Sequence, residues 1–203
     1  MAKDKKKKFA SQQRVLVDNA NISSDLKFRI EEAYKSIRAN IMFSVVKKGC
    51  KIIVVSSSLP NEGKTTTTVN LAASISQADQ RVLLIDGDLR KPKIHQYFSV
   101  SSAPGLTDYL SDVASARHKM DIFGIIHPTK YENLSVITSG TIPPNPAELL
   151  GSDFMRDFLN GISKDFDYII IDTPPLNVVS DALPLIRESD GIVLVVRDNQ
   201  TTH

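Results

Sequence analysis

Short aliphatic runs alternate with helical patterns along most of the chain. Five runs rich in valine and isoleucine occur at 51–56, 81–86, 134–139, 167–172 and 191–196. Their apolar residues follow one another without polar alternation, which predicts strands that are buried on both faces. Strand followed by helix, repeated in this way, is typical of an α/β fold with a mostly parallel sheet and helices on both faces. In that architecture ligands bind beyond the carboxyl ends of the strands.

A helix is predicted ahead of the first strand. Apolar residues recur there at spacings of three and four, which indicates one face of an amphipathic helix: Leu26, Ile30, Ala33, Tyr34, Ile37, Ile41 and Val45. With 203 residues, 41% hydrophobic and 24% charged, the chain suits one globular domain with a sizeable core. We interpret residues 1–27 as a basic, flexible tail and residues 28–203 as that domain.

Charge is unevenly distributed along the chain. The first 14 residues hold six basic residues and one acidic residue, so the remainder of this +2 chain carries a net charge of −3. Such a tail is usually a solvated end, but it also suits attraction to the anionic inner face of the plasma membrane. Nucleic acid is disfavoured as a partner, because the basic residues do not continue as a stripe with aromatic residues between them.

Targeting signals are weak in this sequence. No apolar run approaches the roughly 18 to 20 residues that span a bilayer, and no apolar segment follows the first lysines as in a signal peptide. The single cysteine, Cys50, cannot form an internal disulfide, which agrees with a reducing compartment. We therefore expect a cytoplasmic protein, peripheral at the inner face of the membrane.

The stretch SSSLPNEGKTTTT, residues 56–68, follows the first predicted strand and opens a helical pattern. A phosphate loop reads G-x-x-x-x-G-K-[ST], in which backbone N–H groups wrap the phosphates, the lysine reaches the β and γ oxygens, and the hydroxyl binds Mg²⁺. Gly63, Lys64 and Thr65 fit, whereas Ser58 replaces the first glycine. The simpler interpretation is a turn that caps a helix. The predicted nucleotide-binding residues are Ser58, Pro60, Asn61, Glu62, Gly63, Lys64, Thr65 and Thr66.

Carboxylates follow two further strands. Asp86 and Asp88 end the second predicted strand in LLIDGDLRKP, and Asp172 ends another in YIIIDTPP. Two carboxylates beside a triphosphate can divide metal binding and proton abstraction between them, although D-G-D is also a common turn. Asp172 occupies the position of the acidic residue that helps hold Mg²⁺ in phosphate-loop enzymes.

In combination these motifs resemble the bacterial tyrosine kinases of capsule and exopolysaccharide synthesis, of the separate cytoplasmic type. The likeness covers about residues 28–197. It rests on SSSLPNEGKT as Walker A, VLLIDGDLR as Walker A′ and IIIDTPP as Walker B, with the helix EEAYKSIRANI and the loop GTIPPNPAELL. The resemblance implies a P-loop kinase that transfers the γ-phosphoryl group of ATP to tyrosine.

The resemblance also assigns roles. Lys64 would clamp the phosphates, Asp86 would take the proton from the tyrosine hydroxyl, and Thr65, Asp88 and Asp172 would hold Mg²⁺. The implied partners are protein tyrosine substrates, a transmembrane polysaccharide co-polymerase that activates the kinase, and further copies of the chain in a ring.

Two departures from the family pattern bear on these expectations. The family's ring-interface motif E-x-x-R-x-x-R is present as Glu32, Lys35 and Arg38, and lysine lacks the planar fork of arginine. Family members also continue past 191–196 with a helix, a strand and a tail rich in tyrosine. We therefore expect either that the sequence is a fragment or that its phosphate acceptor lies elsewhere.

Two other functions fit parts of the pattern. A partitioning or septum-positioning ATPase of the ParA and MinD type shares the deviant phosphate loop, but its signature lysine falls where this chain has Leu59. The third possibility is a nucleotide-gated binding module that docks on a polysaccharide co-polymerase without phosphorylating anything.

Overall fold

The computed structural model describes residues 23–115 and 119–198 of the chain. One sheet of six strands forms the centre, in the order β3-β4-β2-β5-β1-β6. Only the β3–β4 pair is antiparallel. The α/β fold with a mostly parallel sheet is therefore confirmed. The strands are β1 (Lys51–Ser57), β2 (Val82–Asp86), β3 (Ile126–Pro128), β4 (Leu134–Ile137), β5 (Tyr168–Asp172) and β6 (Gly191–Val195).

All five predicted strands are present, and two features differ from the prediction. β2 and β5 are buried along their whole length, but β6 is an edge strand whose Ile192 and Leu194 are 45% and 50% exposed. The expectation that every run is buried on both faces is therefore wrong for β6. β3 was not predicted, because the three residues Ile-His-Pro carry no aliphatic run.

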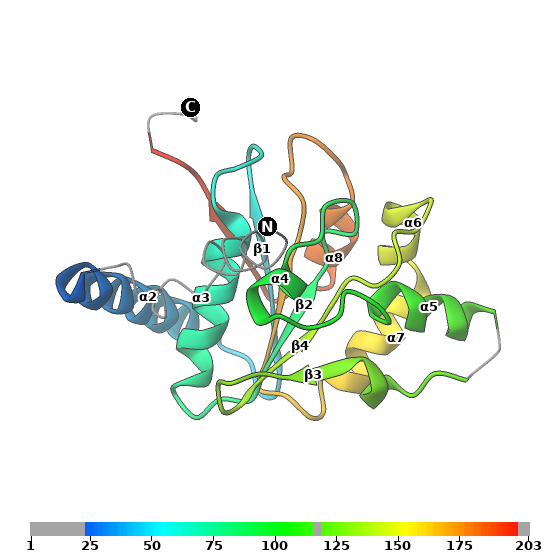
Figure 1. Cartoon of the computed structure of the whole chain (residues 1–203), viewed down its shortest axis with the longest axis horizontal. Helices are drawn as coiled ribbons and strands as arrows, with labels where there is room; N and C mark the ends of the chain where they lie inside the picture. Colours follow the sequence, from blue (N-terminus) through cyan, green and yellow to red (C-terminus); the bar gives the residue numbers. More distant parts are fainter. Residues whose placement is uncertain (1–22, 116–118, 199–203) are drawn as a thin grey trace, which may run out of the picture.

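Helices cover both faces of the sheet (Figure 1). Alternate residues of a strand point to opposite faces. Ile53 and Val55 thus join the core under α2 (Ser24–Ser44), α3 (Lys64–Ser76) and α4 (Ile94–Phe98). Ile52 and Val54 join the other core. That second core is covered by α5 (Leu106–Ala114), the short 3-10 helix η2 (Ile122–Ile125), α6 (Pro146–Leu150), α7 (Asp153–Ile162) and α8 (Ala182–Arg187).

The helix predicted ahead of the first strand is α2, and only its second half packs on the body. It begins at Ser24, where the Ser23 side chain accepts a hydrogen bond from the Leu26 N–H, so it starts before the predicted domain boundary at residue 28. Ile41 is buried, whereas Leu26 and Phe28 are 46% and 61% exposed. The first turns of α2 therefore project from the molecule, as Figure 1 shows. The rest of the predicted tail, residues 1–22, lies outside the described residues.

Within residues 23–115 and 119–198, no helix has the length and apolar character needed to span a membrane.

Candidate active site

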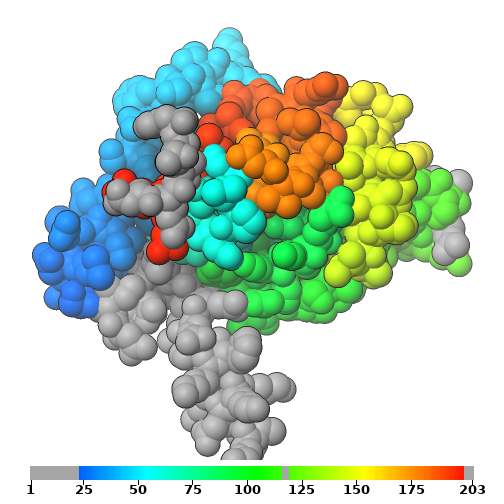
Figure 2. Space-filling view, turned by 90° about the horizontal axis from the view of Figure 1, so that it is seen from above, coloured from blue at the N-terminus to red at the C-terminus, as the bar shows by residue number. Residues whose placement is uncertain are grey.

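The three sequence motifs end neighbouring strands of the sheet. The strand order β2-β5-β1 brings the carboxyl ends of these strands side by side, and Asp86 is directly paired with Asp172 in the register of β2 and β5. The loops that follow β1 and β5 rise together at the same edge (Figure 1). In the space-filling view these cyan and orange segments lie next to each other at the surface (Figure 2). A pocket of about 360 Å³ opens between them.

The phosphate loop turns sharply into α3 at Gly63. This residue has φ of 93°, a left-handed conformation that side-chain-bearing residues rarely adopt, so glycine is required here. Lys64 is the first residue of α3. The first backbone N–H groups of a helix lack partners within the helix and carry partial positive charge, so this end of α3 favours an anion.

Six of the eight predicted nucleotide-binding residues line the pocket: Pro60, Asn61, Gly63, Lys64, Thr65 and Thr66. Ser58 and Glu62 do not line it. The buried carboxylate of Glu62 accepts hydrogen bonds from the Leu59 N–H at 2.7 Å and the Arg197 N–H at 3.3 Å. Glu62 thus holds the loop through its backbone, and its role as a nucleotide contact stays a prediction.

The Lys64 ammonium lies among the three side chains that were predicted to hold Mg²⁺. Its Nζ is 2.9 Å from Asp88 Oδ2, 3.3 Å from Asp172 Oδ2 and 3.4 Å from Thr65 Oγ1. Burial alone would lower the pKa of Lys64, but the two carboxylates outweigh it and raise that pKa above its ordinary value. A positive charge is therefore strongly favoured at this point.

Asp172 is 1% exposed, and both of its carboxylate oxygens accept hydrogen bonds from α3. Its Oδ2 accepts from the Thr65 hydroxyl at 2.7 Å and its Oδ1 from the Thr68 hydroxyl at 2.9 Å. Burial raises the pKa of Asp172, whereas Lys64 and the two hydroxyls oppose that rise. Thr68 was missed from the sequence, although its place three residues after Thr65 puts both hydroxyls on one face of the helix.

Asp86 lies deeper, and it does not line the pocket. Its side chain is fully buried; Oδ2 accepts from the N–H groups of Lys93 at 3.0 Å and Ile94 at 2.9 Å. Oδ1 has no hydrogen-bond partner among the described residues. Burial, reinforced by the nearby Asp172, raises the pKa of Asp86 to about 7. This carboxyl can therefore exchange a proton near neutral pH.

Asp88 connects the lysine to the loop after β2. It is 6% exposed, and its Oδ1 accepts from the Lys91 N–H at 3.0 Å while Oδ2 faces Lys64. Asp86 and Asp88 together therefore fix the backbone of residues 86–94. The D-G-D segment ends β2 without forming a turn itself, and the turn follows at Leu89 and Arg90.

The opposite wall of the pocket was not predicted. It is formed by Pro174, Pro175, Val178 and Val179. Arg90, on the loop after β2, reaches across to Asp181 at the start of α8 through Nε at 2.6 Å and Nη2 at 3.1 Å. Tyr97 of α4 also lines the pocket, with its hydroxyl 2.8 Å from Thr66 Oγ1. Arg90 was visible in the Walker A′ stretch, but nothing in the sequence identifies its distant partner.

The predicted interface residues lie on α2, away from the pocket. Lys35 pairs with Glu32 at 2.7 Å within the helix, and both side chains are about half exposed. Arg38 instead donates to the backbone oxygen of Ser74 on α3. The structure thus uses Arg38 to attach α2 to the body, and a role of the three residues between subunits stays a prediction.

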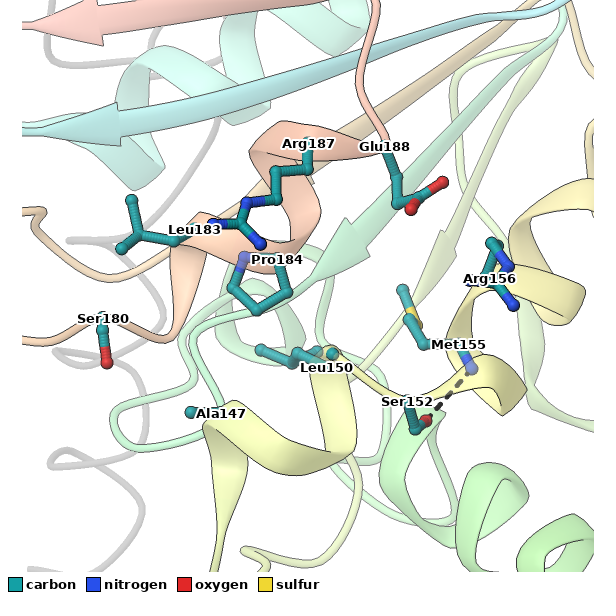
Figure 3. A pocket seen from close by; sticks show the side chains of 11 residues that line it. Ala147, Leu150, Ser152, Met155, Arg156, Ser180, Leu183, Pro184, Arg187 and Glu188 are labelled. Carbon is teal, nitrogen blue, oxygen red and sulfur yellow. Dashed lines mark hydrogen bonds between the residues drawn. The ribbon is translucent and has the colours of Figure 1, made fainter.

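A second pocket, of about 380 Å³, lies beside α8 (Figure 3). Its lining comes from α6, the start of α7 and α8, and includes Leu150, Met155 and Pro184 beside the exposed Arg156 and Arg187. None of the residues predicted for catalysis, nucleotide binding or metal binding lies in it. The two pockets share no lining residue.

The residues around Lys64 fit a magnesium ion bound together with a nucleotide. Mg²⁺ is usually held by one or two carboxylates, with phosphate oxygens and water completing six ligands. Asp88, Asp172 and the Thr65 hydroxyl are this kind of donor set. No group of three or more His, Cys, Asp or Glu side chains suited to a metal occurs within residues 23–115 and 119–198.

The fold and the site define the class of the protein. A family model described as an AAA domain matches residues 50–201. The septum site-determining protein MinD of Pyrococcus horikoshii, solved with Mg-ADP, superposes with a TM-score of 0.58 at 23% identity, over 72% of this chain and 58% of that chain. That similarity shows a shared fold, and the family model over most of the chain makes it an AAA-domain protein.

More similar proteins narrow the class to one family. The tyrosine-protein kinase YwqD of Bacillus subtilis is 41% identical over 170 residues, which cover 84% of this chain and 69% of YwqD. The kinase domain of the Escherichia coli tyrosine kinase ETK superposes with a TM-score of 0.80 at 36% identity, over 93% of this chain and 69% of that chain. The chain belongs to the bacterial tyrosine-protein kinases, which confirms the resemblance found in the sequence.

Proposed function

We propose that this chain binds MgATP in the pocket between the phosphate loop and residues 174–179, and transfers the γ-phosphoryl group to protein tyrosine. One observation carries the proposal: Thr65, Asp88 and Asp172 converge on a single cation position at the start of α3. Family membership supports the choice of tyrosine as the acceptor.

Each side chain then has a role. Mg²⁺, when bound, neutralises phosphate charge and would be held by Thr65, Asp88 and Asp172. Lys64 gives up its place between the two carboxylates and turns to the phosphates. The N–H groups at the start of α3 and the loop backbone orient the phosphates, so the protein contributes positioning and electrostatic stabilisation.

Asp86 is proposed as the group that takes the proton of the tyrosine hydroxyl. The unpartnered Oδ1 leaves one carboxylate oxygen free to accept a proton, and a pKa of about 7 suits a general base near neutral pH. Because Asp86 is fully buried, its side chain must gain access to the pocket before it can act.

Asp86→Asn tests this assignment. An amide cannot accept the tyrosine proton, so we expect nucleotide affinity to stay close to that of the wild type while the rate of phosphoryl transfer falls at least 100-fold. Equilibrium binding of a fluorescent ATP analogue and single-turnover transfer would be measured on the same preparation. If affinity and rate fall together, Asp86 serves metal binding and is not the base.

A ParA or MinD-type ATPase is the second candidate, because the fold is shared with MinD. Leu59, in place of the signature lysine, argues against the ATPase. The third candidate is a nucleotide-gated binding module. Incubation with labelled ATP and a tyrosine peptide separates the three. Phosphotyrosine supports the kinase, free phosphate alone supports the ATPase, and neither product supports the module.

We further propose that the kinase acts in capsule or exopolysaccharide synthesis, bound to a transmembrane polysaccharide co-polymerase at the inner face of the membrane. The resemblance to the separate cytoplasmic type of the family and the basic residues 1–14 support this. The chain alone would then be a poor kinase that a short cytoplasmic segment of its partner activates. Full activity without the segment would contradict the proposal.

Deleting residues 1–14 is expected to release the protein from anionic vesicles, since each lysine near such a surface contributes about 1 kcal/mol.

The same likeness supports a ring of identical subunits, with Glu32, Lys35 and Arg38 at the contact. Light scattering of the Glu32→Ala and Arg38→Ala variants would test the ring.

A further inference from the structure

Two lysines at the mouth of the nucleotide pocket have no acidic partner. The pocket is lined by four basic side chains and one acidic side chain: Lys64, Arg90, Lys91, Lys93 and Asp88. Carboxylates already hold the ammonium of Lys64 and the guanidinium of Arg90. Lys91 and Lys93 are exposed, and within the described part of the chain their side chains form no ion pair or hydrogen bond. Their charges are therefore available to an incoming molecule.

The backbone that carries these lysines is fixed by the site itself. The Lys91 N–H donates to Asp88 Oδ1 at 3.0 Å, and the Lys93 N–H donates to Asp86 Oδ2, also at 3.0 Å. Both side chains thus start from defined points beside the carboxylates that would hold the metal and take the proton. Because both lysines line the pocket, an acceptor tyrosine that enters it would bring its neighbouring residues close to them.

The positive charge is local to this rim. Outside its first 14 residues the chain has a net charge of −3, so a general attraction of anions to the body is not expected. Charges at a binding surface select partners by attracting opposite charge and by repelling like charge.

We propose that Lys91 and Lys93 make the enzyme select tyrosines that are flanked by aspartate or glutamate. This inference rests on the proposed kinase function. Peptides with basic flanks are disfavoured by the same two charges. Because exposed charges are screened over about 8 to 10 Å at 0.10 to 0.15 M salt, the preference weakens as salt rises.

Three synthetic peptides test the proposal on the full chain. Each has one tyrosine with four neighbouring residues that are all glutamate, all glutamine or all lysine. Fluorescence anisotropy with Mg²⁺ and a non-hydrolysable ATP analogue measures binding, and steady-state kinetics measure the KM of each peptide. We expect the glutamate peptide to bind about fivefold more tightly than the glutamine peptide, as two exposed charge pairs allow, and most of this difference to vanish at about 0.5 M salt.

Charge reversal identifies the residues. Lys91→Glu with Lys93→Glu should invert the ranking, so that the lysine peptide binds best. Lys48→Glu with Lys164→Glu is the matched control. These exposed lysines precede β1 and β5, so they lie at the opposite edge of the sheet. The control carries the same change in net charge and should keep the wild-type ranking.

Each outcome decides the proposal. Equal binding of the three peptides, or inversion by the control pair, overturns it. The proposal is also overturned if the double variant Lys91→Glu, Lys93→Glu loses as much affinity for ATP as it loses for the glutamate peptide. The lysines would then serve the nucleotide. Phosphotyrosine without a charge preference keeps the kinase and rejects the inference. If no peptide is phosphorylated even when the partner's cytoplasmic segment is added, the kinase proposal fails, and anisotropy still decides the preference.

Discussion

At the scale of single residues, Lys64 occupies the place that the sequence assigns to a metal ion. Its ammonium lies between Asp88 and Asp172, so under the proposed function Mg²⁺ would compete with the lysine for these carboxylates while no nucleotide is present. We expect Lys64→Met to lower phosphoryl transfer by at least about 100-fold, because the charge that faces the phosphates is lost. Removing one partner of a buried pair should also destabilise the protein by about 3 to 5 kcal/mol.

Thermal unfolding without nucleotide separates these effects. Addition of Mg²⁺ should raise the Tm of Lys64→Met more than that of the wild type, since the ion then restores a cation between two bare carboxylates. Lys164→Met, an exposed lysine at the other edge of the sheet, is the control and should respond as the wild type does. Equal responses of all three proteins would show that Lys64 does not block the metal position.

Asp86 should give the stability of the protein a distinct pH dependence. The pKa of this carboxyl is raised by burial to about 7, from 3.8 in the unfolded chain. Between these values the folded protein keeps a proton that the unfolded chain has lost, so the stabilising contribution falls as pH rises and is lost above about pH 7. Asp86→Asn lacks this titrating group. Its free energy of unfolding, relative to that of the wild type, should therefore rise by about 2 kcal/mol between pH 5 and pH 7.

The measurement is the free energy of unfolding of both proteins at pH 5, 6, 7 and 8 without nucleotide. A difference between variant and wild type that does not change with pH would show that Asp86 titrates in its ordinary range.

At the scale of elements, Arg90 and Asp181 link the loop after β2 to the start of α8. Asp181 is 1% exposed, and its two oxygens accept from Nε and Nη2 of the same guanidinium. Arg90→Ala should lower the Tm by a few degrees and weaken nucleotide binding, because Val178 and Val179 lose the anchor of their segment. The Tm and the nucleotide affinity of Arg90→Lys should stay close to those of Arg90→Ala, since lysine lacks the planar fork of arginine.

The control for this link is Arg156→Ala, which removes an exposed pair with Asp153 on α7. Calorimetry and equilibrium binding of the fluorescent ATP analogue would be compared for the three variants. If Arg90→Lys binds nucleotide as well as the wild type, the link needs only a charge and not the fork.

The elements themselves show which parts of the fold can be predicted. Continuous Val and Ile runs identified all five long strands, because burial on both faces leaves a strong apolar signal. β3 escaped because it holds only three residues at an edge, and β6 kept its apolar sequence although Ile192 and Leu194 are half exposed. The apolar stripe of α2 extends to Leu26, beyond the part of the helix that reaches the body. Periodicity therefore predicts which face is apolar but not where its contacts end.

At the scale of the whole molecule, the site was predictable wherever one motif ends one strand. The proximity of residues 60–66 to the carboxylates at 86, 88 and 172 was predicted in this way, since parallel strands place their carboxyl ends at one edge. Contacts between distant segments were not predictable. Thr66 with Tyr97, and the approach of Lys64 to two carboxylates, depend on side-chain directions that only packing determines.

The burial of tyrosines across the whole molecule leads to the last prediction: this chain, as given, does not accumulate several phosphotyrosines on itself. The sequence has five tyrosines, and the structure leaves none of them exposed: Tyr34, Tyr97, Tyr109, Tyr131 and Tyr168. Tyr168 is 1% exposed within β5, so phosphorylation there requires local unfolding, which costs free energy. Tyr97 lies in the pocket, but its hydroxyl is held by Thr66.

After long incubation with MgATP, mass spectrometry should find at most a low level of single modification. Tyr97→Phe should remove part of that signal if the pocket tyrosine is the one modified, whereas Tyr168→Phe should leave the signal unchanged. Heavy labelling at several sites would show that these tyrosines become accessible far more often than their burial implies.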